Sequence, residues 1–141
     1  MRVLIIDDLI EELNAFKELL ELDGIAVTGA TDVDSGYDMV KAGGFAVVIV
    51  DIMMPPGRYR DRPDNEKGMR TGIYLIQDIR ASFPRLPIIA LTNVSMSGVL
   101  EPLYGCPYIR IVQKTEVSAS LDALPRLVRR SATGSQESQG C

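Results

Sequence analysis

Four short apolar runs, each followed by a polar residue, constrain the fold of this chain more than any other feature. Runs of this length that are rich in Val and Ile are typical of strands buried on both faces of a parallel sheet. In an open parallel sheet, ligands bind beyond the carboxyl ends of the strands. The polar residues are therefore expected to share one small area. They are Asp7 and Asp8 after residues 3–6, Asp51 after residues 46–50, Thr92 after residues 87–91, and Lys114 after residues 108–113.

Segments with helical periodicity alternate with these runs. A further short strand is expected over residues 25–29, and Pro125 should kink or interrupt the last helix. Five strands alternating with about five helices indicate an α/β fold, a five-stranded parallel doubly wound sheet of flavodoxin-like architecture with helices on both faces. The expected apolar stripes are Leu9, Leu13, Phe16 and Leu20; Val33, Tyr37 and Val40; Ile73, Leu75, Ile76 and Ile79; and Val117, Leu121, Leu124 and Val128.

One segment interrupts this alternation. Residues 55–71 contain three prolines, two glycines and dense mixed charge without apolar periodicity, so we expect a long loop inserted after the third strand. Loops of this length are usually functional or disordered, and the basic residues beside Asp51 suggest a lid or a docking element. We place one domain over residues 1–130 and a disordered polar tail over residues 131–141.

Composition and charge narrow the class of protein. The net charge of −4 argues against nucleic acid as a direct partner. No apolar stretch approaches the roughly 20 residues of a membrane span, and the N-terminus lacks a cationic leader. Two cysteines, Cys106 and Cys141, lie far apart in the sequence, so we expect them to be reduced and the protein to be cytoplasmic. The chain has no histidine, which removes histidine-dependent catalysis.

The clustered acids suit a hard cation and a phosphoryl group. Asp7, Asp8 and Asp51 at adjacent strand ends would repel one another unless a cation lay between them. Mg²⁺ prefers one or two carboxylates together with water and phosphate. Asp51, at the end of the central strand, is the best placed nucleophile, and a carboxylate can accept a phosphoryl group. Mg²⁺, the ammonium of Lys114 and a hydroxyl or N–H near Thr92 would neutralise the transferred oxygens.

Each of these residues also has an ordinary interpretation. Asp7 and Asp8 could cap the helix that follows, Thr92 could cap a turn, and Lys114 could be a surface lysine. The side chains of Met53 and Met54 are expected to pack in the structure. Their occurrence together, at four strand ends, favours the phosphoryl site.

These residues, taken in order, resemble the motifs of a known family. The Asp7-Asp8 pair, the D-I-M-M-P run over residues 51–55, Leu91-Thr92 and Lys114 are similar to the motifs of response-regulator receiver domains in two-component signalling. The resemblance covers about residues 1–130. It implies the receiver architecture and a phosphoryl group accepted from a histidine kinase or a phosphotransfer protein.

The resemblance also implies a role for each residue. Asp51 would be the phosphoacceptor, and Asp8 would ligate Mg²⁺ directly together with Asp51. Asp7 would lie in the second shell of the metal, and the backbone carbonyl of Met53 would be a further ligand. Thr92 would turn its hydroxyl towards the phosphoryl group, and Lys114 would pair with it.

The chain departs from the family pattern at several positions. The loop after Asp51 is longer than usual. Thr115 follows the lysine where the family has a cis proline, and a cis bond before a non-proline residue costs roughly 2.5–4 kcal/mol, so we expect a trans bond. Ile111 stands where an aromatic switch residue is expected, and Asn93 follows Thr92 where a smaller residue is common.

Two functions follow from this pattern. The first is a stand-alone receiver that is phosphorylated on Asp51 and switches its binding to an output protein, or its own dimerisation, through a face built from residues 94–128. The alternative is a phosphorylation-independent interaction module on the same fold, favoured by Ile111 and Thr115. An enzyme is not expected, because we see neither a general acid nor a substrate pocket; an aspartyl phosphate would at most hydrolyse slowly in place.

Overall fold

The computed structural model describes residues 1–93 and 97–133, and a single five-stranded parallel sheet lies at its centre. The order of the strands is β2-β1-β3-β4-β5. The strands are β1 (Arg2–Ile6), β2 (Ala26–Ala30), β3 (Val47–Asp51), β4 (Ile88–Thr92) and β5 (Ile109–Gln113). The helices are α1 (Ile10–Leu22), α2 (Val33–Ala42), α3 (Thr71–Ser82), α4 (Ser97–Leu100), α5 (Lys114–Val117) and α6 (Ala123–Ala132), with 3-10 helices η1 (Gly57–Tyr59) and η2 (Glu101–Leu103).

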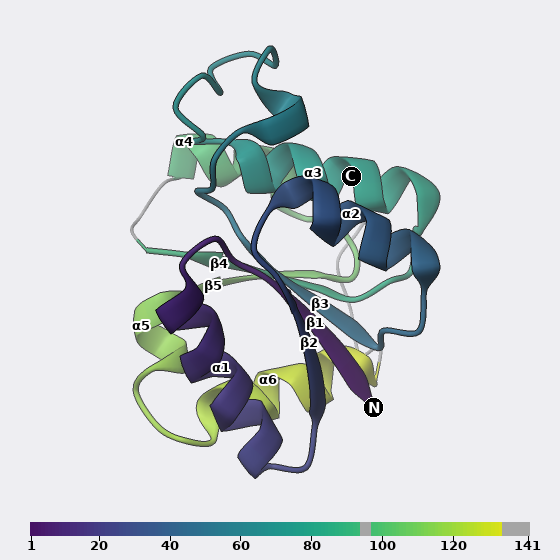
Figure 1. The fold of residues 1–141 in the computed structure, drawn as a ribbon, viewed down its shortest axis with the longest axis vertical. Coiled ribbons are helices and arrows are strands. Elements are labelled where there is room, and N and C mark those ends of the chain that lie inside the picture. Colours follow the sequence, from purple (N-terminus) through teal and green to yellow (C-terminus); the bar gives the residue numbers. More distant parts are fainter. Residues whose placement is uncertain (94–96, 134–141) are drawn as a thin grey trace.

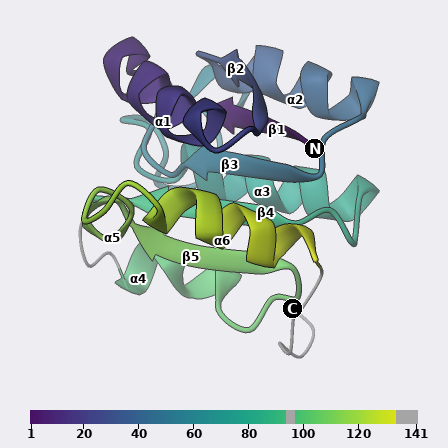
Figure 2. The ribbon, with the colours of Figure 1, turned by 90° about the horizontal axis from the view of Figure 1, so that it is seen from below.

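Helices cover both faces of the sheet. Figure 1 shows α1, α5 and α6 on one face and α2, α3 and α4 on the other. In Figure 2 the strands are stacked in the order above, with α1 and α6 in front of them. Side chains alternate between the two faces along each strand, so Ile5 and Ile49 pack under α1 while Ile6 and Val50 pack under α2 and α3. The predicted doubly wound α/β fold is confirmed.

Two apolar residues of the expected helical stripes are exposed. Leu9 precedes α1 as its N-cap residue and is 49% exposed. Leu121 lies between α5 and α6 and is 76% exposed, because the helix is interrupted there and the helical spacing is lost. The interruption, over residues 118–122, precedes Pro125. Pro125 lies in the first turn of α6, where a missing N–H costs no helical hydrogen bond.

The last helix extends into the segment that was expected to be a disordered tail. α6 continues to Ala132, and Ser131 is buried, so residues 131 and 132 belong to the helix. The rest of the expected tail, from residue 134 onward, lies outside the described residues. Among the described segments, no helix combines the length and the apolar character needed to cross a bilayer.

The expectation of reduced cysteines is wrong for Cys106. This residue is buried and does not carry a free thiol. The distance between two sulfurs in the folded chain decides whether they can form a disulfide, and this distance does not follow from their separation in the sequence. Cys141 lies outside the described residues.

The insertion over residues 55–71 is folded. Asn65, which is fully buried, organises it: its amide donates to the carbonyl of Tyr59 at 3.1 Å, and its oxygen accepts from the N–H of Arg70 at 2.7 Å. The amide also donates to the hydroxyl of Thr71 at 3.1 Å. Backbone contact between Met54 N and Gly68 O at 3.3 Å closes the base of the insertion. The insertion stands at the top of the view in Figure 1.

Aromatic side chains attach the insertion to α3. Tyr59 is buried, and its hydroxyl donates to Asp78 at 2.8 Å. The guanidinium of Arg62 lies 5.4 Å from the ring centre of Tyr59 and 5.3 Å from that of Tyr74, within the range of cation–π contact. The loop is therefore a docked element, and its role as a lid or a docking surface stays a prediction.

Replacing Asn65 with Ala should lower the free energy of unfolding by about 2–4 kcal/mol, because buried partners would lose their hydrogen bonds. Urea denaturation followed by circular dichroism measures this loss. Asn14→Ala, an exposed position on α1, is the matched control and should change the free energy by no more than about 0.5 kcal/mol. Equal stabilities for the two variants would contradict the organising role of Asn65.

Candidate functional site

Parallel register brings the predicted site residues to one edge of the sheet. Ile6 pairs with Val50, so Asp7 and Asp51 follow side by side on neighbouring strands. Leu91 pairs with Asp51, which places Thr92 just beyond the nucleophile. The backbone N–H of Asp7 donates to Ala30 at 3.0 Å and fixes the turn out of β1.

Three carboxyl groups meet at this edge. Each of Asp7, Asp8 and Asp51 offers a carboxylate oxygen, and these oxygens all lie within 4.8 Å of one another. Asp7 and Asp51 are buried, and Asp8 is half-buried. Buried like charges at this spacing repel strongly, so protons or cations must compensate them.

The start of α3 packs directly behind Asp51 because Gly72 has no side chain. A Cβ at this position would lie 2.5 Å from the carbonyl oxygen of Asp51 and 2.6 Å from the Cα of Ile52. The N–H of Gly72 donates to Ile52 O at 2.8 Å. This close approach fixes the backbone at the end of β3, and with it the position of the Asp51 carboxylate.

Lys114 reaches into the cluster from the far strand. It is only 6% exposed, and its ammonium nitrogen lies 3.2 Å from Asp51 Oδ1. Burial alone would lower the pKa of Lys114, but the carboxylates of Glu12 and Asp51 outweigh that effect and raise it. Lys114 is therefore charged at neutral pH.

Glu12 is the site residue that the sequence analysis missed. It lies in the first turn of α1, and its Oε1 is 2.5 Å from the ammonium of Lys114. The apolar stripe of Leu13, Phe16 and Leu20 leaves Glu12 on another side of the helix, so the periodicity alone gives it no role. A usable signal existed, since Glu12 lies in the first turn of the helix that follows Asp7 and Asp8, and the side chains of a helix lean back towards its N-terminus.

Burial and mutual contact set the protonation of the acids. Burial raises the pKa of Asp7 to about 8, and the adjoining carboxyls of Glu12 and Asp51 add to this, against a lowering by the N–H of Leu9 at 2.9 Å. Burial also raises the pKa of Asp51 to about 6, although Lys114 opposes the shift. Burial would raise the pKa of Glu12, but its contacts with Asp7 and Lys114 lower it. Asp7 therefore holds a proton at neutral pH while Glu12 is ionised.

Comparison with known proteins decides the family. The sequence profile of the response regulator receiver domain matches residues 3–123. This chain belongs to the response regulator receiver domain family. No curated protein matches the sequence.

Solved structures show the same fold at low sequence identity. The receiver domain of the Francisella response regulator 1452 is 23% identical, with a TM-score of 0.69 over 94% of this chain and 96% of that one. TrrA from Thermotoga maritima, solved in complex with Mg²⁺ and BeF, is 23% identical, with a TM-score of 0.70 over 92% and 97%. NtrX from Brucella abortus, solved with ATP, is 18% identical, with a TM-score of 0.69 over 94% of this chain and 27% of that chain.

This receiver keeps the departures noted in its sequence. The bond between Lys114 and Thr115 is trans, as expected, since the described residues contain no cis peptide bond. Ile111 is half-buried and packs against the core under α3. Thr92 is buried at the end of β4, and Asn93 is exposed. The proposed movement of the Thr92 hydroxyl stays a prediction.

The acidic edge of the receiver suits Mg²⁺. Asp7 Oδ2 is buried and has no hydrogen-bond donor within the described part of the chain, and its carboxyl lies against that of Glu12, so a proton or a cation must lie between these acids. A hard cation with oxygen ligands matches this donor set. Asp8 and Asp51 would hold the ion, with Asp7 beside them. The side chain of Met53 is 39% exposed, so the expectation that it packs in the structure is wrong, whereas Met54 is buried. The carbonyl of Met53 as a further ligand stays a prediction.

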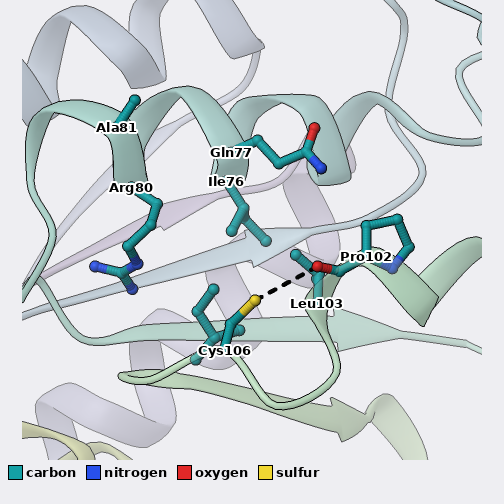
Figure 3. Close-up of a pocket in the computed structure, with 8 residues that line it drawn as sticks. Ile76, Gln77, Arg80, Ala81, Pro102, Leu103 and Cys106 are labelled. Carbon is teal, nitrogen blue, oxygen red and sulfur yellow. Dashed lines mark hydrogen bonds between the residues drawn. The ribbon is translucent and has the colours of Figure 1, made fainter. Parts of the chain in front are cut away.

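A hollow of about 310 Å³ lies between α3 and the segment that leads into β5 (Figure 3). Its one charged side chain, Arg80, already donates to the carbonyls of Phe83, Leu86 and Tyr108 at 2.7–3.3 Å. None of the predicted site residues lines it. The lining residues are Ile76, Gln77, Arg80, Ala81, Pro102, Leu103, Cys106 and Ile109.

The affinity for Mg²⁺ should rise with pH. Because the pKa of Asp7 is about 8 and that of Asp51 about 6, the acids hold protons that a cation must displace. We expect binding roughly tenfold tighter at pH 9 than at pH 7, measured by isothermal titration calorimetry. Lys114 stays charged over this range because its pKa is raised. Asp7→Asn should remove most of the dependence, and equal affinity of the unmodified protein at both pH values would contradict these pKa shifts.

Proposed function

We propose that this receiver accepts a phosphoryl group on Asp51 from a histidine kinase or a phosphotransfer protein. The observation that carries the proposal is the surrounding of the Asp51 carboxylate. It is 4% exposed, with the ammonium of Lys114 at 3.2 Å and the carboxyls of Asp7 and Asp8 close by. This arrangement supplies a nucleophile, a fixed cation and a ligand set for Mg²⁺.

In the proposed reaction an oxygen of Asp51 attacks phosphorus. A new P–O bond forms as the bond between phosphorus and the histidine nitrogen of the donor breaks, and the electron pair of that bond stays on the donor nitrogen. The ammonium of Lys114 would stabilise negative charge on the transferred oxygens, and the hydroxyl of Thr92 would turn towards them. Bound Mg²⁺ would supply further charge neutralisation at the same oxygens.

We propose that the phosphorylated form acts by binding an output protein or a second copy of itself. The phosphoryl group carries about −1.5 to −2 charge and offers acceptor oxygens that can bias the conformation of nearby segments. The proposed output face, residues 94–128, comprises α4, η2, β5, α5 and the first part of α6, with residues 94–96 outside the described part. Ile111 occupies the position of the aromatic switch, so the signal would travel without an aromatic side chain.

We further propose that the protein is not an enzyme acting on a separate substrate, and that its aspartyl phosphate hydrolyses slowly in place. We also propose that the protein is located in the cytoplasm, where a histidine kinase would find the ATP from which it takes the phosphoryl group.

The second candidate function is a phosphorylation-independent interaction module. It is favoured by Ile111 at the switch position and by the contact between Lys114 and Glu12 at 2.5 Å, which occupies the ammonium that a phosphoryl group needs. The two candidates differ in one measurable property, the ability of Asp51 to be phosphorylated.

Incubation with acetyl phosphate and Mg²⁺ should add the mass of one phosphoryl group to the protein, read by intact-mass spectrometry. Asp51→Asn should abolish the addition, and so should chelation of the metal. Asp61→Asn, an exposed acid in the insertion, is the matched control and should be labelled like the unmodified protein. Absence of labelling, in a protein that calorimetry shows to bind Mg²⁺, would support the phosphorylation-independent module instead.

A further inference from the structure

Glu12 holds the ammonium of Lys114 more closely than the proposed phosphoacceptor does. The distance from Lys114 Nζ is 2.5 Å to Glu12 Oε1 and 3.2 Å to Asp51 Oδ1. The side chain of Lys114 is 8% exposed, and that of Glu12 is 24% exposed. The pair is thus largely shielded from water, which makes its electrostatic interaction stronger than that of a surface ion pair.

We propose that Glu12 competes with the phosphoryl group for Lys114 and so limits the stability of the phosphorylated state. The inference rests on the proposed function and concerns the regulation of that site. Glu12 acts through Lys114, as a positioning residue, and makes no contact with the phosphoryl group itself.

Charge counting shows why the two anions compete. Before phosphorylation, Lys114 lies between the carboxylates of Glu12 and Asp51. Phosphorylation replaces the single charge of Asp51 with about −1.5 to −2 on oxygens that reach further into the site. Among the described residues, Lys114 is the one lysine whose ammonium pairs with Glu12 or Asp51, whereas Lys17, Lys41 and Lys67 are half-buried or exposed. One ammonium then serves two anions.

Both ways of resolving the competition disfavour the phosphorylated state. If Lys114 stays with Glu12, its contact with the phosphoryl oxygens is weakened. If Lys114 moves to the phosphoryl group, the carboxylate of Glu12 loses its ion pair and keeps only the carboxyl of Asp7 as a partner, and the loss of a counter-charge is costly for a carboxylate that is largely shielded from water. A neutral side chain at position 12 removes both costs.

A purely structural role for Glu12 makes a different prediction. On that view, the pair with Lys114 only fastens α1 to the end of β5, and its loss would reduce stability without favouring a bound anion. The two roles therefore differ in the sign of the effect on phosphoryl binding, which is what the experiment measures.

The test is the affinity for beryllofluoride, a non-covalent analogue of the phosphoryl group, in the presence of saturating Mg²⁺. We expect Glu12→Gln to bind beryllofluoride about tenfold more tightly than the unmodified protein, as measured by calorimetry. Glu11→Gln is the matched control: it removes the same charge from the same helical turn at an exposed position and should leave the affinity within about twofold.

A second measurement follows Lys114 itself. The ammonium groups of buried, paired lysines exchange slowly with water, so ¹⁵N-detected NMR of the lysine side chains should show Lys114 apart from the three accessible lysines. Its resonance should shift in Glu12→Gln without any ligand, and in the unmodified protein on addition of beryllofluoride and Mg²⁺. Glu11→Gln should leave it unchanged.

The outcomes separate this inference from the proposed function. Tighter binding by Glu12→Gln, or binding by that variant alone, supports the competition. Equal or weaker binding by Glu12→Gln, with normal binding by the unmodified protein, overturns the inference and leaves the proposed function standing. Failure of every variant to bind beryllofluoride, despite binding Mg²⁺, overturns the proposed function and the inference with it. A Lys114 resonance that does not shift in Glu12→Gln also overturns the inference.

Discussion

Parallel pairing of β1, β3, β4 and β5 is the constraint on which the rest of the molecule depends. Because these strands run in one direction, their carboxyl ends meet at the same edge, and residues more than a hundred positions apart become neighbours. The alternation of side chains along each strand buries the sheet under helices on both faces. The edge is then the region where polar groups from several strands can converge, and the sheet supplies a rigid frame for them.

Convergence of acids has an electrostatic cost that the site meets in two ways. A proton on Asp7 and the ammonium of Lys114 compensate carboxyls that burial would otherwise destabilise. Glu12 connects α1 to the same group of charges through its ion pair with Lys114. The helix α1, the carboxylate of Asp51 and the end of β5 therefore share one set of interactions. Any ligand of this site, cation or anion, must rearrange that set.

Most of the fold and the placement of Asp7, Asp8, Asp51, Thr92 and Lys114 were predictable, because buried parallel strands have a strong apolar signature and their ends are marked by polar residues. Glu12 was not, because an amphipathic pattern places a helical acid on the outer side and does not show that the first turn faces the sheet edge. The exposure of Leu121 was not predicted, because the apolar spacing continues in the sequence across the residues at which the helix is interrupted. The folding of the insertion was hidden as well, since it depends on one buried amide, Asn65, and not on any periodicity.

The base of the insertion has a consequence for how chains of this kind vary in length. Met54 and Gly68 are joined by a backbone hydrogen bond, and Ile52 and Gly72 by another, so the two ends of the segment touch. A segment closed in this way adds chain at little entropic cost, since that cost grows only slowly with loop length. Residues can thus be gained or lost between these positions while β3 and α3 keep their places. Changes in the insertion can therefore alter the surface beside the site, while the sheet keeps the geometry within the site fixed.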